Sequence, residues 1–143
     1  MPLYEYIYPS VAASEEKMLD DVLTALQANA VSKYLLNRFM LVVSEAFTNA
    51  LEHGNECDPN KKIKLVLDIS NELLSADIID EGRKGLEKIK RRRSPTMLSE
   101  GGRGVDLMEH YAGAVRFSET ESGGLKVSIR FNQTKGYKVQ HHT

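Results

Sequence analysis

Residues 41–55 read LVVSEAFTNALEHGN, and the rest of the chain is best interpreted outward from this stretch. Its apolar residues recur at helical spacing, so we predict a helix from about residue 33 to His53, ended by Gly54 and Asn55. Glu45, Asn49 and His53 are four residues apart and therefore share one face of that helix. A carboxylate and an amide one turn apart can together handle a proton and a hydrated divalent cation.

Both polar residues also have purely structural explanations. Glu45 could lie on a solvated helix face, and Asn49 could bond to a neighbouring backbone carbonyl. Asparagine is nevertheless unfavourable inside a helix, and this one stands next to apolar Ala50 and Leu51. His53 is better explained by packing or capping at the helix end than by ligation. The helix by itself leaves a structural and a functional interpretation open.

The composition describes one globular domain, which we assign to residues 1–134, with a flexible tail at 135–143. The chain has 143 residues, 41% of them hydrophobic and 27% charged. A net charge of -1 gives no reason to expect nucleic acid as a partner. The single cysteine, Cys57, cannot form an intramolecular disulfide. No apolar stretch is long enough for a membrane span and no export signal is evident, so we expect a cytoplasmic protein.

Hydrophobic patterning indicates the order of the elements. Strands are predicted over residues 4–8, 63–69, 74–79, 115–119 and 125–131, a first helix after a capping Ser14, and a short helix over 104–111. Pro9 favours an edge position for the first strand. Because strands come in hairpins, we predict an α+β two-layer sandwich: a mixed sheet covered by helices on one face. Residues 81–102 are polar and glycine-rich, which is typical of a functional connection.

Asp80 and Gly82 form a second feature, directly after the apolar strand at 74–79. A carboxylate fixed at a strand end can accept a hydrogen bond from an amine, and a glycine lets a flat ring approach the backbone. Adenine fits both requirements. Taken alone, Asp-x-Gly is also common in ordinary turns.

A third feature is the run Gly101-Gly102-Arg103-Gly104 before an apolar segment. A glycine-rich entry to a helix exposes backbone N–H groups at the positive end of the helix dipole, which favours phosphate. A loop with a simple helix cap would explain the same residues. The preceding run Arg91-Arg92-Arg93 is explained either by solvation or by a role in contacting phosphate or an acidic partner.

Glu45-x-x-x-Asn49, Asp80-x-Gly82 and Gly102-Arg103-Gly104, in this order, resemble the GHKL (Bergerat-fold) ATPase domain of sensor histidine kinases and gyrase B. The chain is most similar to the anti-sigma factor serine/threonine kinases typified by RsbW and SpoIIAB, over nearly its whole length. The resemblance implies ATP and Mg²⁺ as cofactors. It implies these roles: Glu45 as catalytic base, Asn49 as magnesium ligand, Asp80 as acceptor of the adenine amine, Gly82 beside the ring, and Gly101, Gly102, Arg103 and Gly104 around the phosphates.

The same resemblance implies a function in transcription. Such a kinase binds a sigma factor or similar effector, and it phosphorylates a STAS-domain antagonist, a mechanism called partner switching; many members form homodimers. Two alternatives are a non-catalytic, nucleotide-gated binding module and a detached catalytic domain of a histidine kinase. The chain departs from the family pattern at Lys84, where a second glycine is usual, and at Leu125, where threonine often follows the glycine. Both departures bear on nucleotide affinity.

Overall fold

The computed structural model describes residues 3–92 and 113–133. Its elements are β1 (Leu3–Pro9), α1 (Ala13–Ala28), α2 (Lys33–Asn49), a π-helical turn η1 (Ala50–Gly54), β2 (Lys62–Ile69), β3 (Leu73–Ile79), α3 (Gly85–Arg92), β4 (Ala114–Glu119) and β5 (Leu125–Asn132). The helix predicted over 104–111 and the tail predicted over 135–143 lie outside the described residues.

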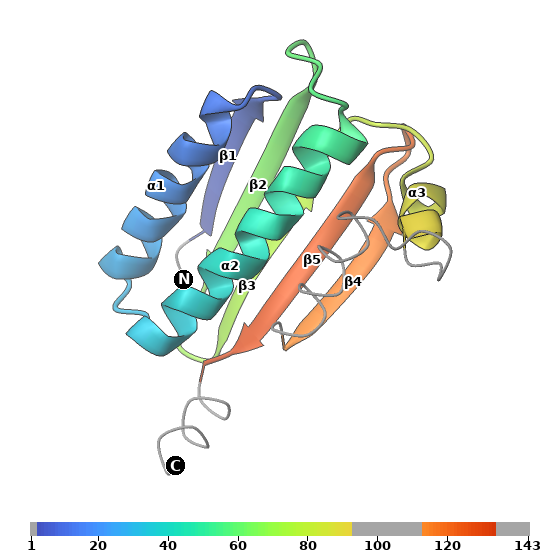
Figure 1. The fold of residues 1–143 in the computed structure, drawn as a ribbon. Coiled ribbons are helices and arrows are strands. Elements are labelled where there is room, and N and C mark those ends of the chain that lie inside the picture. The colour runs from blue at the N-terminus through green and yellow to red at the C-terminus, as the bar shows by residue number, and fades with distance from the viewer. Residues whose placement is uncertain (1–2, 93–112, 134–143) are drawn as a thin grey trace.

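One five-stranded sheet forms the first layer, with the strand order β1-β2-β3-β5-β4. Helices α1 and α2 cover one of its faces (Figure 1), so the predicted α+β two-layer architecture is confirmed. The expected mixture of strand directions is wrong for the described strands, whose pairs are all antiparallel. The reason is that β2–β3 and β4–β5 are direct hairpins, and β5 runs beside β3 in the opposite direction.

The core lies between the sheet and the two long helices. Strand β2 alternates as the sequence predicted, and its inward residues Ile63, Leu65, Leu67 and Ile69 are buried. Facing them are the fully buried helix residues Met18, Val22, Leu26, Phe39, Val43 and Phe47. Each such large apolar side chain contributes about 1.5–3 kcal/mol through removal from water. No helix in the described ranges is long and apolar enough to cross a membrane.

Strand β1 occupies a sheet edge, as Pro9 predicted. Tyr4, Tyr6 and Tyr8 lie on its helix side and stack on one another, with ring centroids 6.3 and 6.2 Å apart. Tyr8 also meets the edge of Phe47 at 5.5 Å. The period-two pattern of this strand therefore arises from aromatic packing against the helices.

The corner between β1 and α1 differs from the prediction at Ser14. The residue before the helix is Ala12, and Ser14 lies inside the first turn, where its hydroxyl donates to the Pro9 carbonyl at 2.7 Å. Ser10, fully buried in the same corner, donates from its hydroxyl to the Lys61 carbonyl at 2.8 Å. Serine hydroxyls thus tie the end of β1 to its surroundings instead of capping α1.

Candidate functional site

Helix α2 brings the residues of the opening motif to one end of the sheet. Ser32 caps it by accepting from the Leu35 backbone N–H at 3.3 Å. Beyond Asn49 the helix continues as the π-helical turn η1, in which the Asn55 N–H donates to the Ala50 carbonyl at 2.8 Å. The predicted extent to His53 is confirmed, but the widened turn was not predictable from local pattern. Such π-turns are frequent at functional sites.

Glu45 and Asn49 lie in the C-terminal half of α2 and differ in exposure. Asn49 is buried, with 6% of its surface exposed, whereas Glu45 is half-buried. Burial, followed by the negative charge of Glu52, raises the pKa of the Glu45 carboxyl above its ordinary value. Glu45 is therefore not a fully solvated surface residue, and its carboxylate holds a proton more readily than most.

Asp80 is almost completely buried, with 4% exposed, at the end of β3. Its Oδ1 accepts hydrogen bonds from the backbone N–H groups of Gly82 at 2.9 Å and Leu125 at 3.0 Å. Burial raises the pKa of the Asp80 carboxyl, although these two N–H groups and the positive charges of Lys88 and Lys61 act in the opposite direction. The carboxylate is held in one orientation by backbone N–H groups from the turn after β3 and from the start of β5.

Three glycines pack directly on Asp80. A Cβ atom added to Gly54 would overlap the Asp80 carboxylate, one on Gly124 would overlap the Asp80 carbonyl, and one on Gly82 would overlap the Gly54 carbonyl. The end of α2, the turn after β3 and the start of β5 therefore meet at distances that only glycine permits. We call Asp80, Gly82, Gly54, Gly124 and Leu125 the Asp80 corner.

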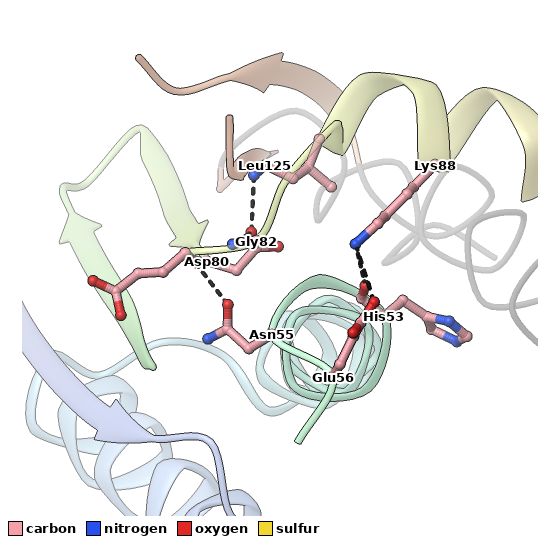
Figure 2. A network of polar contacts seen from close by, with 8 residues as sticks. His53, Asn55, Glu56, Asp80, Gly82, Lys88 and Leu125 are labelled. Atoms are coloured by element: carbon pink, nitrogen blue, oxygen red, sulfur yellow. Dashed lines mark hydrogen bonds and ion pairs between the residues drawn. The ribbon is translucent and has the colours of Figure 1, made fainter. Parts of the chain in front are cut away.

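Asn55 belongs to the same region and was not recognised from the sequence, where it was interpreted as part of a helix stop. Its side chain is fully buried. The Oδ1 atom accepts from the Glu81 backbone N–H at 2.7 Å (Figure 2). Nδ2 donates to Ser10 Oγ at 2.8 Å and to the Lys62 carbonyl at 2.9 Å. An asparagine after a helix is so common as a terminator that local pattern cannot reveal these distant partners.

Residues 83–92 were predicted as part of a polar connection, but they include helix α3. Only Leu86 and Ile89 are apolar within it, three residues apart, which is too little periodicity for prediction in so short a segment. Lys84, just before the helix, has a φ of 53°, in the left-handed region that favours glycine. The departure from the family pattern at this position is therefore accommodated by a strained backbone.

Lys88 fastens α3 to the end of the α2 motif. Its Nζ donates to the His53 carbonyl at 3.1 Å and lies 3.6 Å from Glu56 Oε2 (Figure 2). A pocket lies between these elements, lined by His53, Gly54, Asp80, Arg83, Gly85, Lys88, Ile89 and Leu125. The pocket combines a buried acceptor, apolar walls and two cationic side chains, a set suited to a purine with attached phosphates.

The predicted phosphate-binding residues and the last residue of the predicted arginine run are not part of the described structure. Gly101, Gly102, Arg103 and Gly104 lie outside the described residues, as does Arg93, while Arg91 is exposed near the end of α3. Within the described ranges, no three acidic, histidine or cysteine side chains are grouped so that they could hold a metal. The side-chain oxygen that Asn49 supplies on α2 nevertheless fits magnesium, because this ion commonly takes only one or two oxygen ligands from the protein and completes its coordination shell with water and phosphate.

Comparison with known proteins gives consistent matches. The profile of the histidine kinase-like ATPase domain matches residues 9–131. The anti-sigma F factor of Anoxybacillus flavithermus is 31% identical over 105 residues, which cover 70% of this chain and 71% of that protein. The solved RsbU and RsbW domains of a Mycobacterium tuberculosis protein superpose with a TM-score of 0.68 at 14% identity, covering 92% of this chain and 32% of that longer chain.

A chain of the SiaB–SiaC complex from Pseudomonas aeruginosa superposes with a TM-score of 0.55 at 14% identity, covering 90% of this chain and 89% of that one. At such low identity the two solved structures establish the shared fold. The family profile shows membership of the family as well as the fold, because it matches residues 9–131, from the end of β1 into β5. The chain therefore belongs to the histidine kinase-like ATPase family, among the relatives of the anti-sigma factors.

Proposed function

We propose that the protein is an ATP-dependent serine/threonine kinase that regulates transcription by partner switching. The observation that carries this proposal is the buried Asp80 carboxylate, oriented by two backbone N–H groups beside a pocket that the end of the α2 motif also lines. A fixed acceptor of this kind recognises an amine on a flat ring. The family of ATPase domains makes a nucleotide the natural ligand.

The adenine amine would donate to Asp80, whose carboxylate the Gly82 N–H holds beside the ring. Arg83 and Lys88 line the same pocket and supply positive charge near the ligand. The phosphates would extend toward Gly101, Gly102, Arg103 and Gly104. A guanidinium such as that of Arg103 matches phosphate oxygens with two parallel hydrogen bonds.

On α2, Glu45 would act as the base toward the hydroxyl of a partner's serine. The hydroxyl oxygen attacks the terminal phosphorus, its proton passes to the Glu45 carboxylate, and ADP leaves. The raised pKa of Glu45 favours this role, because a carboxylate with higher proton affinity is the better base. Asn49 would bind Mg²⁺, which neutralises phosphate charge when the nucleotide is bound.

The partners follow from the relatives, which are named anti-sigma F factors. We infer that this chain binds a sigma factor or similar effector in the cytoplasm, and that a STAS-domain antagonist competes for it and is phosphorylated on serine. A phosphate added at the docking surface would prevent renewed binding through charge repulsion and desolvation. A homodimer is the expected assembly.

Substitution of Glu45 tests the kinase assignment. Glu45→Gln should keep Mg-ATP binding within about threefold but lose phosphoryl transfer by 100-fold or more, since general-base catalysis contributes roughly 10²–10⁴-fold. Transfer is measured with labelled ATP and the STAS-domain proteins of the same organism, and nucleotide binding is measured by calorimetry. Glu52→Gln is the matched control, because it leaves the Glu45 carboxylate in place and removes only the neighbouring exposed charge, which is the smaller of the two causes that raise the Glu45 pKa. Undiminished transfer by Glu45→Gln would exclude Glu45 as the base.

The Lys88 contact favours one second candidate, a nucleotide-gated binding module without catalysis. Lys88 joins α3 to the end of the α2 motif, so a nucleotide in the pocket between them could change how α3 docks. In that case ATP would alter effector binding equally in wild type and Glu45→Gln, and no antagonist would be labelled. Labelling by the wild type alone distinguishes the kinase from this module.

A further inference from the structure

We propose that Asn55 is a positioning residue of the nucleotide site. It fixes the turn that carries Asp80 to the end of helix α2 and thereby sets the preference for a purine with a 6-amino group. This inference rests on the proposed binding of ATP at Asp80. It concerns a residue that lies outside the three motifs and is not among the residues that line the pocket.

The first step is the turn itself. The Gly82 N–H is held by the carboxylate of Asp80, and the intervening Glu81 N–H is held by Asn55 Oδ1 at 2.7 Å. Both N–H groups after Asp80 therefore have fixed acceptors, one from within the turn and one from the end of α2. Removal of the Asn55 amide would leave the Glu81 N–H, whose hydrogen bond is partly buried, without its partner and would favour a rearranged turn.

The second step is the anchoring of Asn55. Its Nδ2 uses both donors, one on Ser10 Oγ and one on the Lys62 carbonyl, so the amide group is held on the side opposite Glu81. Ser10 is itself tied to Lys61, on the segment that enters β2. The amide therefore joins the β1–α1 corner, the start of β2, the end of η1 and the turn after β3. Its oxygen cannot move without disturbing two other hydrogen bonds, one buried and one partly buried.

The third step connects the amide to ligand choice. Asp80 discriminates an amine from a carbonyl only if its carboxylate stays in one place relative to the base edge. Adenine offers an amine at that edge, whereas hypoxanthine offers a carbonyl oxygen. A loosened turn should therefore weaken ATP binding specifically and leave inosine triphosphate binding nearly unchanged. A general loss of folded structure would weaken both nucleotides in proportion.

The experiment measures dissociation constants of Mg-ATP and Mg-ITP by calorimetry for the wild type, Asn55→Ala and Ser10→Ala. The wild type should prefer ATP, and Asn55→Ala should reduce the ATP-to-ITP preference about tenfold, the equivalent of one well-placed hydrogen bond. Ser10→Ala is the matched control, because it removes a buried hydrogen bond of Asn55 but leaves the Glu81 contact. Ser10→Ala should keep the ATP-to-ITP preference within about threefold of the wild-type value.

Two further variants keep the test decisive if Asn55→Ala does not fold. Asn55→Ser retains a small polar group that is too short to reach Glu81, and it should show the same loss of preference. Asn55→Asp keeps an oxygen facing Glu81 while losing the two donors, so it should unfold at lower urea concentration yet retain more of the preference than Asn55→Ser.

Three results would overturn the inference. A proportional loss of ATP and ITP binding in the Asn55 variants would assign Asn55 a structural role alone. An equal loss of preference in Ser10→Ala would locate the effect in the β1–α1 corner. A wild type that binds ATP but has no preference over ITP would remove the basis for a positioning role, whereas a wild type that binds neither nucleotide would refute the proposed function itself.

Discussion

The Asp80 corner and helix α3 line the same pocket but are held in place by different means. The corner is fixed by buried backbone hydrogen bonds and by glycine contacts that leave no room for a methyl group. Ile89 is the only side chain buried among the described residues of helix α3, whose one other buried position is Gly85, and the helix is joined to the α2 end through the Lys88 ammonium. Disturbing the corner should therefore cost far more than disturbing α3.

This difference corresponds to two tasks in a nucleotide site. Recognition of a base requires an acceptor whose position is set before the ligand arrives, which the corner provides. Response to a ligand requires an element whose attachment is weak enough to change, because segments with few buried contacts open at low free-energy cost. The Asp80 corner is thus the rigid side of the pocket, and helix α3 is its adjustable side.

The largest effect is expected from Gly82→Ala. The added methyl group would overlap the Gly54 carbonyl, so the turn and the end of α2 would have to separate, lowering the free energy of unfolding by about 3 kcal/mol. Urea denaturation measures this loss, and ATP binding should disappear with it. Gly113→Ala introduces a similar overlap with the Arg130 carbonyl, away from the pocket, and should destabilise the fold while ATP binding persists. Normal stability of Gly82→Ala would show that the corner is not tightly packed.

Asp80→Asn should leave the fold intact and weaken ATP binding about 10- to 100-fold, the value of a hydrogen bond to a charged group.

The raised pKa of the Asp80 carboxyl also determines how stability and ATP affinity should change with pH. The folded protein binds the Asp80 proton more tightly than the unfolded chain, so this group's stabilising contribution is present at low pH and is lost as pH rises through the raised pKa. Ionisation is needed to accept the amine, so ATP affinity should show the opposite trend.

ATP affinity of the free wild type should therefore fall on acidification, beginning above the ordinary aspartate range. Calorimetric titrations at several pH values, compared with Asp80→Asn, isolate the contribution of this carboxyl from that of the phosphates. Parallel pH profiles in the two proteins would mean that Asp80 does not contact the base.

The sequence predicted those parts of the molecule whose cause is local or periodic. Alternation in β2 predicted its buried face, and the position of Asp80 after β3 predicted a carboxylate at a strand end. The contacts that make the site were not predictable in this way. Asn55 meets Glu81 across 26 positions of the chain and Ser10 across 45, and nothing in the neighbouring residues specifies such partners. The antiparallel position of β5 beside β3 is likewise a property of the assembled sheet.

Lys88→Met tests how helix α3 is attached, and we expect a smaller loss of stability than from Gly82→Ala. The variant keeps most of the apolar stem but loses the ammonium group, and with it the bond to the His53 carbonyl and the pairing with Glu56. A loss of about 1 kcal/mol is expected, confined to α3. Amide hydrogen exchange should therefore accelerate in residues 86–91 but not in β3 or β5.

Glu56→Gln is the matched control for Lys88. The Glu56 side chain is 72% exposed, so its pairing with Lys88 is screened by water and should contribute no more than about 0.3 kcal/mol. The His53 contact remains in this variant. Faster exchange in β3 as well as α3 after Lys88→Met would show that the two walls of the pocket form one cooperative unit.

The smallest effect is expected from Lys84→Gly, at the junction of the two walls. Lys84 has a left-handed φ of 53°, which costs a side-chain-bearing residue roughly 1–2 kcal/mol, while glycine adopts it freely but gains freedom in the unfolded chain. The free energy of unfolding should therefore rise by about 0.5 kcal/mol in urea denaturation. Ala30→Gly relieves the same strain, φ 54°, in the link between α1 and α2 and should give a similar gain. If the corner is as rigid as its contacts indicate, neither variant should change ATP affinity, and tighter binding by Lys84→Gly alone would show that strain at Lys84 reaches the base-binding wall.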